Sequence, residues 1–275
     1  MTHERVPYSG IETEIQTGTL LRESPLAKET EGKPVTVITI GGRGGTGKTA
    51  TLHAFARLIE EYTGKNVDVF KVGEELVRKP LREATGEEVL GAEDTPLEKD
   101  RAIEAIMAER IRNATPDRIL LMEGWTAALN AQEVINQAIQ NGETPPVVVS
   151  FLLTAKYRTR MPRIAKRQGV SKHRAEIATR AREKANYGRF EKLYPRIQGR
   201  DMFNPANKDN QGRPIYTAII GTNEIDYPAV ALTGFIWLAN RGNLLPRTDD
   251  RQDGKADTKR VLPDSADVFP PPSAA

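Results

Sequence analysis

The sequence contains no cysteine, and that absence removes several kinds of chemistry. Disulfide bridges, thiolate nucleophiles and cysteine-based zinc or iron–sulfur centres are all excluded. Histidine is nearly as scarce, because the chain has three, His3, His53 and His173, which lie far apart. Their spacing matches no metal-binding motif, so we expect surface histidines rather than metal ligands.

Long apolar runs are also lacking. The longest, Ala229 to Ala239, falls well short of the roughly 20 residues that a membrane-spanning helix needs. No apolar run follows the polar N-terminal residues, so we expect no signal peptide. These observations predict a cytoplasmic protein that does not contact a membrane.

Charge of one sign is not in large excess, since the formal net charge is +3 over 275 residues. This balance does not by itself indicate a nucleic-acid-binding protein. Hydrophobic residues make up 38% and charged residues 28%, which is typical of a soluble globular protein. We interpret residues 34–245 as the folded domain. Residues 1–33 are expected to form a flexible extension that can include a short ordered piece, and residues 246–275 a disordered tail.

Within the folded domain, short apolar or β-branched runs alternate with segments of helical period. Strands are expected at residues 35–40, 66–72, 118–122, 146–153 and 216–220. Helices are expected at residues 49–62, 74–82, 96–112, 171–192 and 227–240. This alternation predicts an α/β fold, in which helices cover both faces of a parallel sheet.

A glycine-rich loop follows the first strand and matches the G-x-x-x-x-G-K-[ST] pattern in full. Its glycines let backbone N–H groups face phosphate oxygens, its lysine places a charge on the β- and γ-phosphates, and the next helix points its positive end at the anion. The candidate ATP-binding residues are Gly42, Gly44, Gly45, Thr46, Gly47, Lys48 and Thr49. The alternative is a glycine-rich turn that matches by chance, but the strand before it and the helix after it favour a P-loop.

A P-loop also needs oxygen ligands for Mg²⁺, and two residues are candidates. The Thr49 hydroxyl suits this ion, which prefers oxygen. Glu123 ends the apolar strand Ile119 to Met122, so its carboxylate would face the same crevice as the P-loop. The alternative for Glu123 is an ordinary exposed glutamate at a strand end.

Positive charges are dense between Lys156 and Arg200. One interpretation is a nucleic-acid footprint. The other is a lid that folds arginines over transferring phosphates, where one arginine can contribute about 10³–10⁵ in rate. We favour the lid because a P-loop is present and aromatic residues are few. Arginines at helical spacing form two sets, Arg160, Arg163 and Arg167 on one face and Arg182 and Arg189 on another.

These residues together resemble the cytidylate kinases, especially their compact archaeal-type branch. The similarity spans roughly Val35 to Ile225 and rests on five stretches in the family's order: the P-loop, Val72 to Arg78, Met122 to Gly124, Leu153 to Gly169 and Arg182 to Tyr194. The resemblance implies a P-loop kinase fold with helical segments that bind a nucleoside monophosphate and form a lid, at roughly residues 160–195. It also implies that Arg78, after Gly73, grips the phosphate of the acceptor.

The chain departs from the family's pattern at three places. Trp125 stands where the family has an arginine that helps to hold the acceptor, and this tryptophan would either stack on a base or belong to the core. Tyr187 stands where a lid arginine is common. Residues 195–214 form a longer connection than the family has, in the region that reads the base.

We therefore expect a monomeric ATP- and Mg²⁺-dependent kinase that phosphorylates a nucleoside monophosphate, with CMP or dCMP as the preferred acceptor. Lys48, Arg160, Arg163, Arg182 and Arg189 are the candidate catalytic residues. Gly73, Arg78 and Trp125 would bind the acceptor, and nucleic acid is not an expected partner. One alternative is a kinase for another small acceptor, where a hydroxyl would need a base such as Asp68, Asp94 or Asp100. Another is a regulatory or nucleic-acid-associated P-loop protein.

Overall fold

The computed structural model describes residues 12–15, 19–80, 83, 96–197 and 201–244. Within them, a seven-stranded sheet has the order β1-β2-β7-β6-β3-β5-β4. The strands are β1 (Glu12–Ile15), β2 (Thr19–Glu23), β3 (Val37–Gly42), β4 (Asn66–Lys71), β5 (Arg118–Glu123), β6 (Val148–Thr154) and β7 (Ala218–Gly221). The five strands from β7 to β4 pair in parallel, and β1 and β2 add an antiparallel edge.

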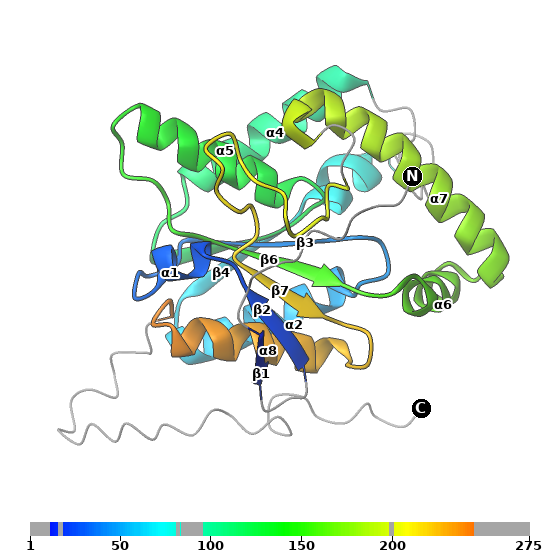
Figure 1. The fold of residues 1–275 in the computed structure, drawn as a ribbon, viewed down its shortest axis with the longest axis horizontal. Helices are drawn as coiled ribbons and strands as arrows, with labels where there is room; N and C mark the ends of the chain where they lie inside the picture. The colour runs from blue at the N-terminus through cyan, green and yellow to red at the C-terminus, as the bar shows by residue number, and fades with distance from the viewer. Residues whose placement is uncertain (1–11, 16–18, 81–82, 84–95, 198–200, 245–275) are drawn as a thin grey trace.

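Helices cover both faces of this sheet, as Figure 1 shows. The helical elements are α1 (Leu26–Thr30), α2 (Lys48–Thr63), η1 (Glu74–Arg78), α4 (Leu97–Arg112), α5 (Ala127–Gln140), α6 (Tyr157–Gln168), α7 (Lys172–Leu193), η2 (Pro195–Ile197) and α8 (Tyr227–Asn240). Helices α2 and α8 lie on one face and α4 and α5 on the other, while α6 and α7 extend beyond one end of the sheet. The predicted α/β fold, with a parallel sheet covered on both sides, is confirmed.

The core is built from the buried faces of these layers. Between the sheet and the α2–α8 layer, Phe151 meets Phe55 and Trp237 edge to face, with ring centroids 5.8 and 5.5 Å apart. Such contacts stabilise the layer beyond simple area burial. On the other face, Met107 and Ile111 of α4 pack with the central strands and α5. The strands are therefore held rigidly where they deliver the site residues.

The segment expected to be a flexible extension is partly built into the sheet, which corrects the domain boundary at residue 33. Strand β2 pairs antiparallel with β7 through Leu21, Arg22 and Glu23, and Leu21 is fully buried. The edge of β7 offers unpaired backbone groups, and a neighbouring strand satisfies them even when its own sequence is mostly polar. The expected tail at residues 246–275 lies outside the described residues.

Two helices escaped the sequence analysis. Helix α5 buries three polar residues, Asn130, Gln132 and Asn136, and these interrupt the apolar period that would have indicated it. Helix α1, at Leu26–Thr30, is only five residues long, too short to show a helical period in the sequence. Among the described residues, no helix is both long enough and apolar enough to cross a bilayer.

Candidate active site

The site lies where three neighbouring parallel strands end. Strand β3 leads into the P-loop, β5 on one side of it ends at Glu123, and β6 on the other side leads toward α6. The carboxyl ends of parallel strands at a change of strand order form a ligand-binding crevice in open α/β sheets. This topology brings together residues that are more than 100 positions apart in the sequence.

The backbone of the P-loop requires glycine at several positions. Gly42, Gly45 and Gly47 have φ angles of 144°, 81° and 92°, which L side chains rarely adopt. A Cβ at Gly42 would lie 2.5 Å from the backbone oxygen of Leu153, and one at Gly45 would lie 2.8 Å from that of Arg160. The loop therefore packs directly against β6 and α6, with no room for a side chain at Gly42 or Gly45.

Thr46 takes part in the shape of the loop. Its hydroxyl donates to the backbone oxygen of Arg43 at 2.9 Å, and its own carbonyl accepts from the Thr222 hydroxyl at 3.1 Å. Gly44, Gly45 and Gly47 line the adjoining cavity, whereas Gly42 and Thr46 do not line it.

Lys48 is buried at the start of α2. Its Nζ donates to the backbone oxygens of Gly42 at 2.7 Å and Arg43 at 3.1 Å, which leaves the third N–H of the ammonium for a phosphate oxygen. Burial lowers the pKa of Lys48 to about 8, an effect that the Glu123 carboxylate opposes and three nearby arginines reinforce. An anion in the cavity would restore the full charge of this lysine.

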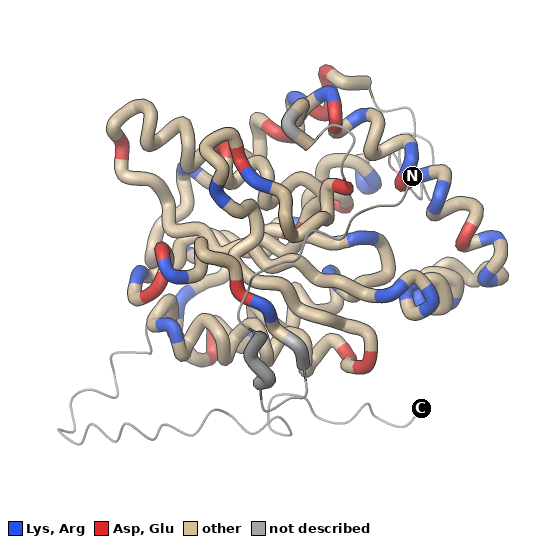
Figure 2. The backbone as a smooth tube through the Cα atoms, in the orientation of Figure 1, with Lys and Arg blue, Asp and Glu red and all other residues tan. Residues whose placement is uncertain are grey.

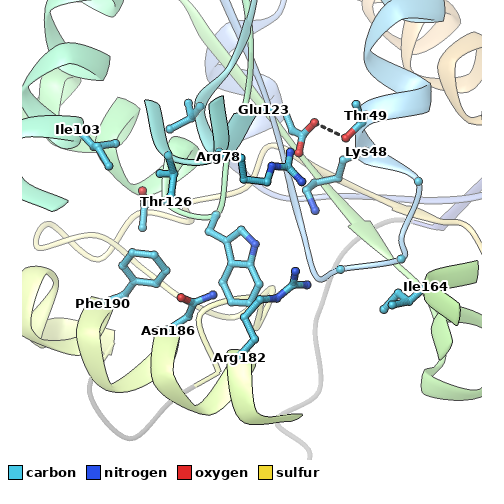
Figure 3. Close-up of a pocket in the computed structure, with 18 of the residues that line it drawn as sticks. Lys48, Thr49, Arg78, Ile103, Glu123, Thr126, Ile164, Arg182, Asn186 and Phe190 are labelled. Atoms are coloured by element: carbon cyan, nitrogen blue, oxygen red, sulfur yellow. Dashed lines mark hydrogen bonds between the residues drawn. The ribbon is translucent and has the colours of Figure 1, made fainter. Parts of the chain in front are cut away.

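Thr49 and Glu123 meet as the sequence predicted. The Thr49 hydroxyl donates to Glu123 Oε2 at 2.7 Å, as the dashed line in Figure 3 shows. Both groups supply oxygen, the atom type that Mg²⁺ prefers, and this ion commonly takes one or two protein oxygens and completes its shell with phosphate and water. In the described parts of the chain, no cluster of three or more His, Asp or Glu side chains could hold a metal by itself. The Thr49–Glu123 pair therefore fits a Mg²⁺ ion that arrives with a nucleotide.

A cavity of about 430 Å³ runs from the P-loop to helices α4 and α7. At one end it is lined by the P-loop glycines, Lys48 and Glu123. At the other end it is lined by Asp100, Trp125, Phe190 and their neighbours. Its volume falls within the range of small-molecule sites, and its continuity allows two ligands to meet inside it.

Cations converge in the middle of this cavity. Arg78, Arg167 and Arg182 line it from η1, α6 and α7, and Figure 3 shows Arg78 and Arg182 pointing toward Lys48. Burial, and then the charge of Arg167, lowers the pKa of Arg182. Burial, and then the charge of Arg78, lowers the pKa of Arg167. Arginines that lower one another's pKa repel each other, and an anion bound between them would relieve this repulsion. Arg78 also pairs with Glu74 at 2.9 Å.

Two arginines of the predicted catalytic set, Arg160 and Arg163, have partners within the protein. Arg160 is 3% exposed and does not line the cavity; its Nη1 donates to Glu183 Oε1 at 2.8 Å and to the Gly44 backbone oxygen at 3.1 Å. Arg163 lines the cavity, but its Nη2 donates to the backbone oxygen of Thr222 at 2.9 Å. Helical spacing placed both residues beside the P-loop, but packing directs their guanidinium groups toward protein carbonyls and a carboxylate.

Arg189 lies at the far end of the cavity rather than over the P-loop. Its Nε is 2.6 Å from Asp100 Oδ2, and both residues line the cavity. Burial raises the pKa of Asp100, while the Arg189 guanidinium opposes that rise. This ion pair makes the far end polar without giving it a large net charge. Gly73, the other predicted acceptor residue, lines the same cavity.

Trp125 lies between the core and the cavity. Its ring contacts Phe203 edge to face at 5.2 Å and lies 6.2 Å from Phe190, and it also lines the cavity. Tyr187 packs beside it at 6.3 Å and donates its hydroxyl to Asp201 Oδ1 at 3.0 Å. One side of the tryptophan therefore belongs to an aromatic cluster, and another side forms the wall of the cavity.

Sequence reasoning missed two polar residues at this end. Asn186 is 9% exposed and lines the cavity, and within the described part of the chain its side-chain amide forms no hydrogen bond. It lies on α7 between Arg182 and Arg189, so helical spacing would have placed it on their face. Glu104, one turn after Asp100 on α4, accepts from Thr126, Asn130 and Tyr194, and burial raises its pKa despite these hydrogen bonds.

Charge on the surface follows the same helices. Figure 2 shows lysine and arginine along α6 and α7, where the sequence predicted the lid. Of the basic residues on these helices, Arg163, Arg167, Arg182 and Arg189 line the cavity, whereas Arg158, Lys166, Arg174 and Lys184 are exposed to solvent. Solvent screening makes such exposed charges individually weak.

No protein-family model matches the chain, and no curated protein matches it either. Several solved structures are similar to the chain at low identity. The shikimate kinase from Acinetobacter baumannii in complex with shikimate has 16% identity and a TM-score of 0.41, with 78% of this chain and 98% of that chain covered. A gluconokinase from Sinorhizobium meliloti 1021 has 13% identity and a TM-score of 0.41, covering 75% of this chain and 94% of that one.

The tunicamycin resistance protein from Deinococcus radiodurans has 18% identity and a TM-score of 0.39, with 78% of this chain and 99% of that chain covered. Likenesses of this degree transfer neither a substrate nor an activity. The strand order, the glycine-constrained loop and the Lys48, Thr49 and Glu123 constellation are features of the chain itself. They establish an α/β fold whose P-loop opens into a cation-lined cavity.

Proposed function

We propose that the protein is an ATP- and Mg²⁺-dependent kinase that transfers the γ-phosphate to a nucleoside monophosphate, with CMP or dCMP as the preferred acceptor. One observation carries this proposal. A single cavity joins the P-loop to an aromatic and polar pocket, and Lys48, Arg78, Arg167 and Arg182 line it around its middle. A nucleoside triphosphate at one end and a monophosphate at the other would bring their phosphates together among these cations.

The division of the cavity gives each group a role. The P-loop amides and Lys48 would bind the β- and γ-phosphates, and Thr49 with Glu123 would hold Mg²⁺, which supplies charge neutralisation for the phosphates. Arg78 would hold the acceptor's phosphate. Arg182 and Arg167, from the two lid helices, would stabilise the charge that develops on the γ-phosphoryl group. Helices α6 and α7 would also limit the access of water, which otherwise would accept the phosphoryl group.

The transfer needs no general base with this acceptor. An oxygen of the acceptor's phosphate is already ionised at neutral pH, and it forms a bond to the γ-phosphorus while the bond from that phosphorus to the β,γ-bridging oxygen breaks. ADP leaves with the bridging oxygen and its electron pair. Position and charge therefore carry the rate.

The acceptor end suits a flat, polar group. Trp125 and Phe190 provide apolar surface for a base, while Asn186 offers both a hydrogen-bond donor and an acceptor. The Asp100–Arg189 pair offers a carboxylate and a guanidinium, which would match the amino and carbonyl groups of cytosine. These contacts support a pyrimidine monophosphate, and the acceptor assay decides among bases.

A small-molecule hydroxyl is the second candidate acceptor, because one predicted base lies in the cavity. Asp100 lines it, whereas Asp68 lies on another surface beside Arg110 and Arg118, and Asp94 is outside the described residues. Asp100 would then accept the proton of the hydroxyl. Its pairing with Arg189 disfavours this role, because the guanidinium engages Oδ2 and opposes the rise in pKa that burial causes.

The test is an acceptor panel. Purified protein with Mg–ATP is given CMP, dCMP, UMP, AMP, GMP or dTMP, and ADP release is compared with an acceptor-free control. We expect stimulation by CMP or dCMP, loss of transfer in Lys48→Met, and a raised acceptor KM with little change in the ATP KM in Arg78→Ala. Arg57→Ala, which removes an exposed arginine of α2 outside the cavity, is the matched control. If no monophosphate stimulates ADP release, the proposed acceptor class is wrong.

A further inference from the structure

Arg43, at a position that the P-loop pattern leaves unspecified, turns its side chain away from the cavity and binds two other segments. Its Nη1 donates to Glu183 Oε2 at 2.8 Å, on lid helix α7. Its Nη2 donates to Asp201 Oδ2, in the segment that follows α7. None of these three residues lines the cavity. An arginine fork that holds two carboxylates from different segments fixes their relative positions.

Glu183 uses both of its oxygens on arginines that flank the P-loop. Oε2 accepts from Arg43 in the loop, and Oε1 accepts from Arg160 in α6 at 2.8 Å. The same Arg160 Nη1 donates to the Gly44 backbone oxygen at 3.1 Å. The carboxylate is 11% exposed, so the removal of either arginine would leave a largely desolvated charge with one partner fewer.

This arrangement sets the register of the lid helix against the P-loop. Arg182 precedes Glu183 on α7 and lines the cavity, whereas Glu183 faces Arg43 and Arg160. A Cβ at Gly44 would lie 2.6 Å from Arg182 Nη2, so the guanidinium sits directly on the loop. When Arg43 holds Glu183, it therefore also holds Arg182 beside the site of the γ-phosphate.

Asp201 extends the connection to the acceptor end. Its Oδ1 accepts from the Tyr187 hydroxyl and from the backbone N–H of Phe203, both at 3.0 Å. The Phe203 ring contacts Trp125 edge to face at 5.2 Å, and Trp125 lines the acceptor end of the cavity. A chain of direct contacts thus leads from the P-loop backbone to the wall of the acceptor pocket.

We propose that Arg43, Glu183 and Asp201 form a clasp, and that Arg43 is a positioning residue that couples nucleotide on the P-loop to the placement of Arg182 and of the Trp125 wall. The backbone oxygen of Arg43 accepts from Lys48 Nζ at 3.1 Å, so a phosphate that engages Lys48 acts on the same residue that holds the lid. The kinetic part of this inference rests on the proposed kinase function. The coupling itself does not.

The first experiment compares Arg43→Met, Arg43→Lys and the surface control Arg57→Met in phosphoryl transfer. We expect Arg43→Met to lower kcat by about 10²-fold, the loss that a displacement of about 1 Å can cause, with the ATP KM changed by less than about threefold. Arg43→Lys should recover part of the rate, since a lysine can reach one carboxylate but cannot fork to two. Arg57→Met should match the wild type. An unchanged kcat in Arg43→Met, or a fall in ATP affinity as large as the fall in kcat, would overturn the positioning role.

The second experiment needs no acceptor. Hydrogen exchange of the segment 201–217 is followed with and without saturating Mg–ADP. We expect nucleotide to slow exchange there in the wild type and Arg57→Met, and to have no effect in Arg43→Met. Glu183→Gln, which keeps the size of the side chain and removes its charge, serves if Arg43→Met does not fold, and it should also lose the response. If bound nucleotide leaves the exchange rate of this segment unchanged in the wild type, the clasp proposal is wrong, even if the transfer assay succeeds. If no acceptor is found and the response is present, the kinase proposal fails and the clasp stands.

Discussion

The buried P-loop lysine predicts that nucleotide binding takes up a proton near pH 8. In the free protein, burial lowers the pKa of Lys48 to about 8, with Arg182, Arg167 and Arg160 reinforcing the effect and Glu123 opposing it. Phosphate groups beside the ammonium favour its charged form and should return the pKa toward about 10.4, the ordinary value of lysine. The nucleotide-bound protein therefore holds more protons than the free protein between these two values.

The magnitude follows from linkage. At pH 8 about half of the free protein carries a neutral Lys48, so binding takes up about 0.5 proton, and at pH 9 about 0.9. Because the bound state holds more protons, affinity falls as the pH rises. Between pH 7 and pH 9 the dissociation constant should increase about tenfold, which equals about 1.4 kcal/mol.

The assay is isothermal titration calorimetry with Mg–ADP at pH 7, 8 and 9, in pairs of buffers that differ in ionisation enthalpy. The terminal phosphate of the nucleotide titrates near pH 6, so it contributes little in this range. Lys48→Met is the control and should bind weakly, with no proton uptake at pH 8. Affinity that stays constant within about twofold from pH 7 to pH 9, without proton uptake, would show that Lys48 keeps an ordinary pKa, and the reasoning from burial would be refuted.

Three further predictions follow from particular contacts. Glu123→Gln should raise the Mg²⁺ concentration needed for half-maximal nucleotide binding by about tenfold or more, because a neutral amide binds the ion more weakly than a carboxylate does. A Mg²⁺ titration measures this midpoint. An unchanged midpoint would show that Glu123 does not belong to the metal site. Gly45→Ala should weaken Mg–ADP binding about tenfold and lower Tm, because the new Cβ would lie 2.8 Å from the Arg160 backbone oxygen. The control Gly169→Ala has open space around its Cβ and should cost only about 1–2 kcal/mol of stability, for its left-handed backbone. Calorimetry and thermal melts would measure this difference. Leu21→Ala should lower the free energy of unfolding by about 2–5 kcal/mol in a urea titration, because this side chain is fully buried; a loss below about 0.5 kcal/mol would mean that β2 is not part of the stable sheet.

Local patterns in the sequence were enough to predict the central layers. The strand at residues 118–122 became β5 at Arg118–Glu123, and the helix at residues 227–240 became α8 with those bounds. These elements are strongly apolar, so their period and their burial agree. The elements that were missed carry polar residues in buried positions, as Asn130 and Asn136 do in α5, or depend on a partner strand, as β2 does.

Some parts of the candidate site could likewise be predicted from local sequence, and others could not. The P-loop is contiguous in the sequence, and the chemistry of phosphate binding fixes its glycines, lysine and threonine at set spacing, so a single sequence reveals it. Glu123 was also predictable, because the end of an apolar strand beside the P-loop strand points to the crevice. The direction of each lid arginine was not, since helical spacing gives a face but not the partner that a long side chain selects.

The sequence by itself determined the fold class, the glycine-rich P-loop motif and the helix that carries Arg182 and Arg189. The tertiary structure alone decided that Arg160 donates hydrogen bonds to Glu183 and to the Gly44 backbone oxygen, that Asn186 lines the cavity, and that Arg43 joins the loop to two distant carboxylates. The physical reason is the distance along the sequence over which each feature is determined. Backbone conformation and helical period are set within a few residues, whereas the partner of a buried charge depends on desolvation and on which groups the sheet brings from more than a hundred residues away.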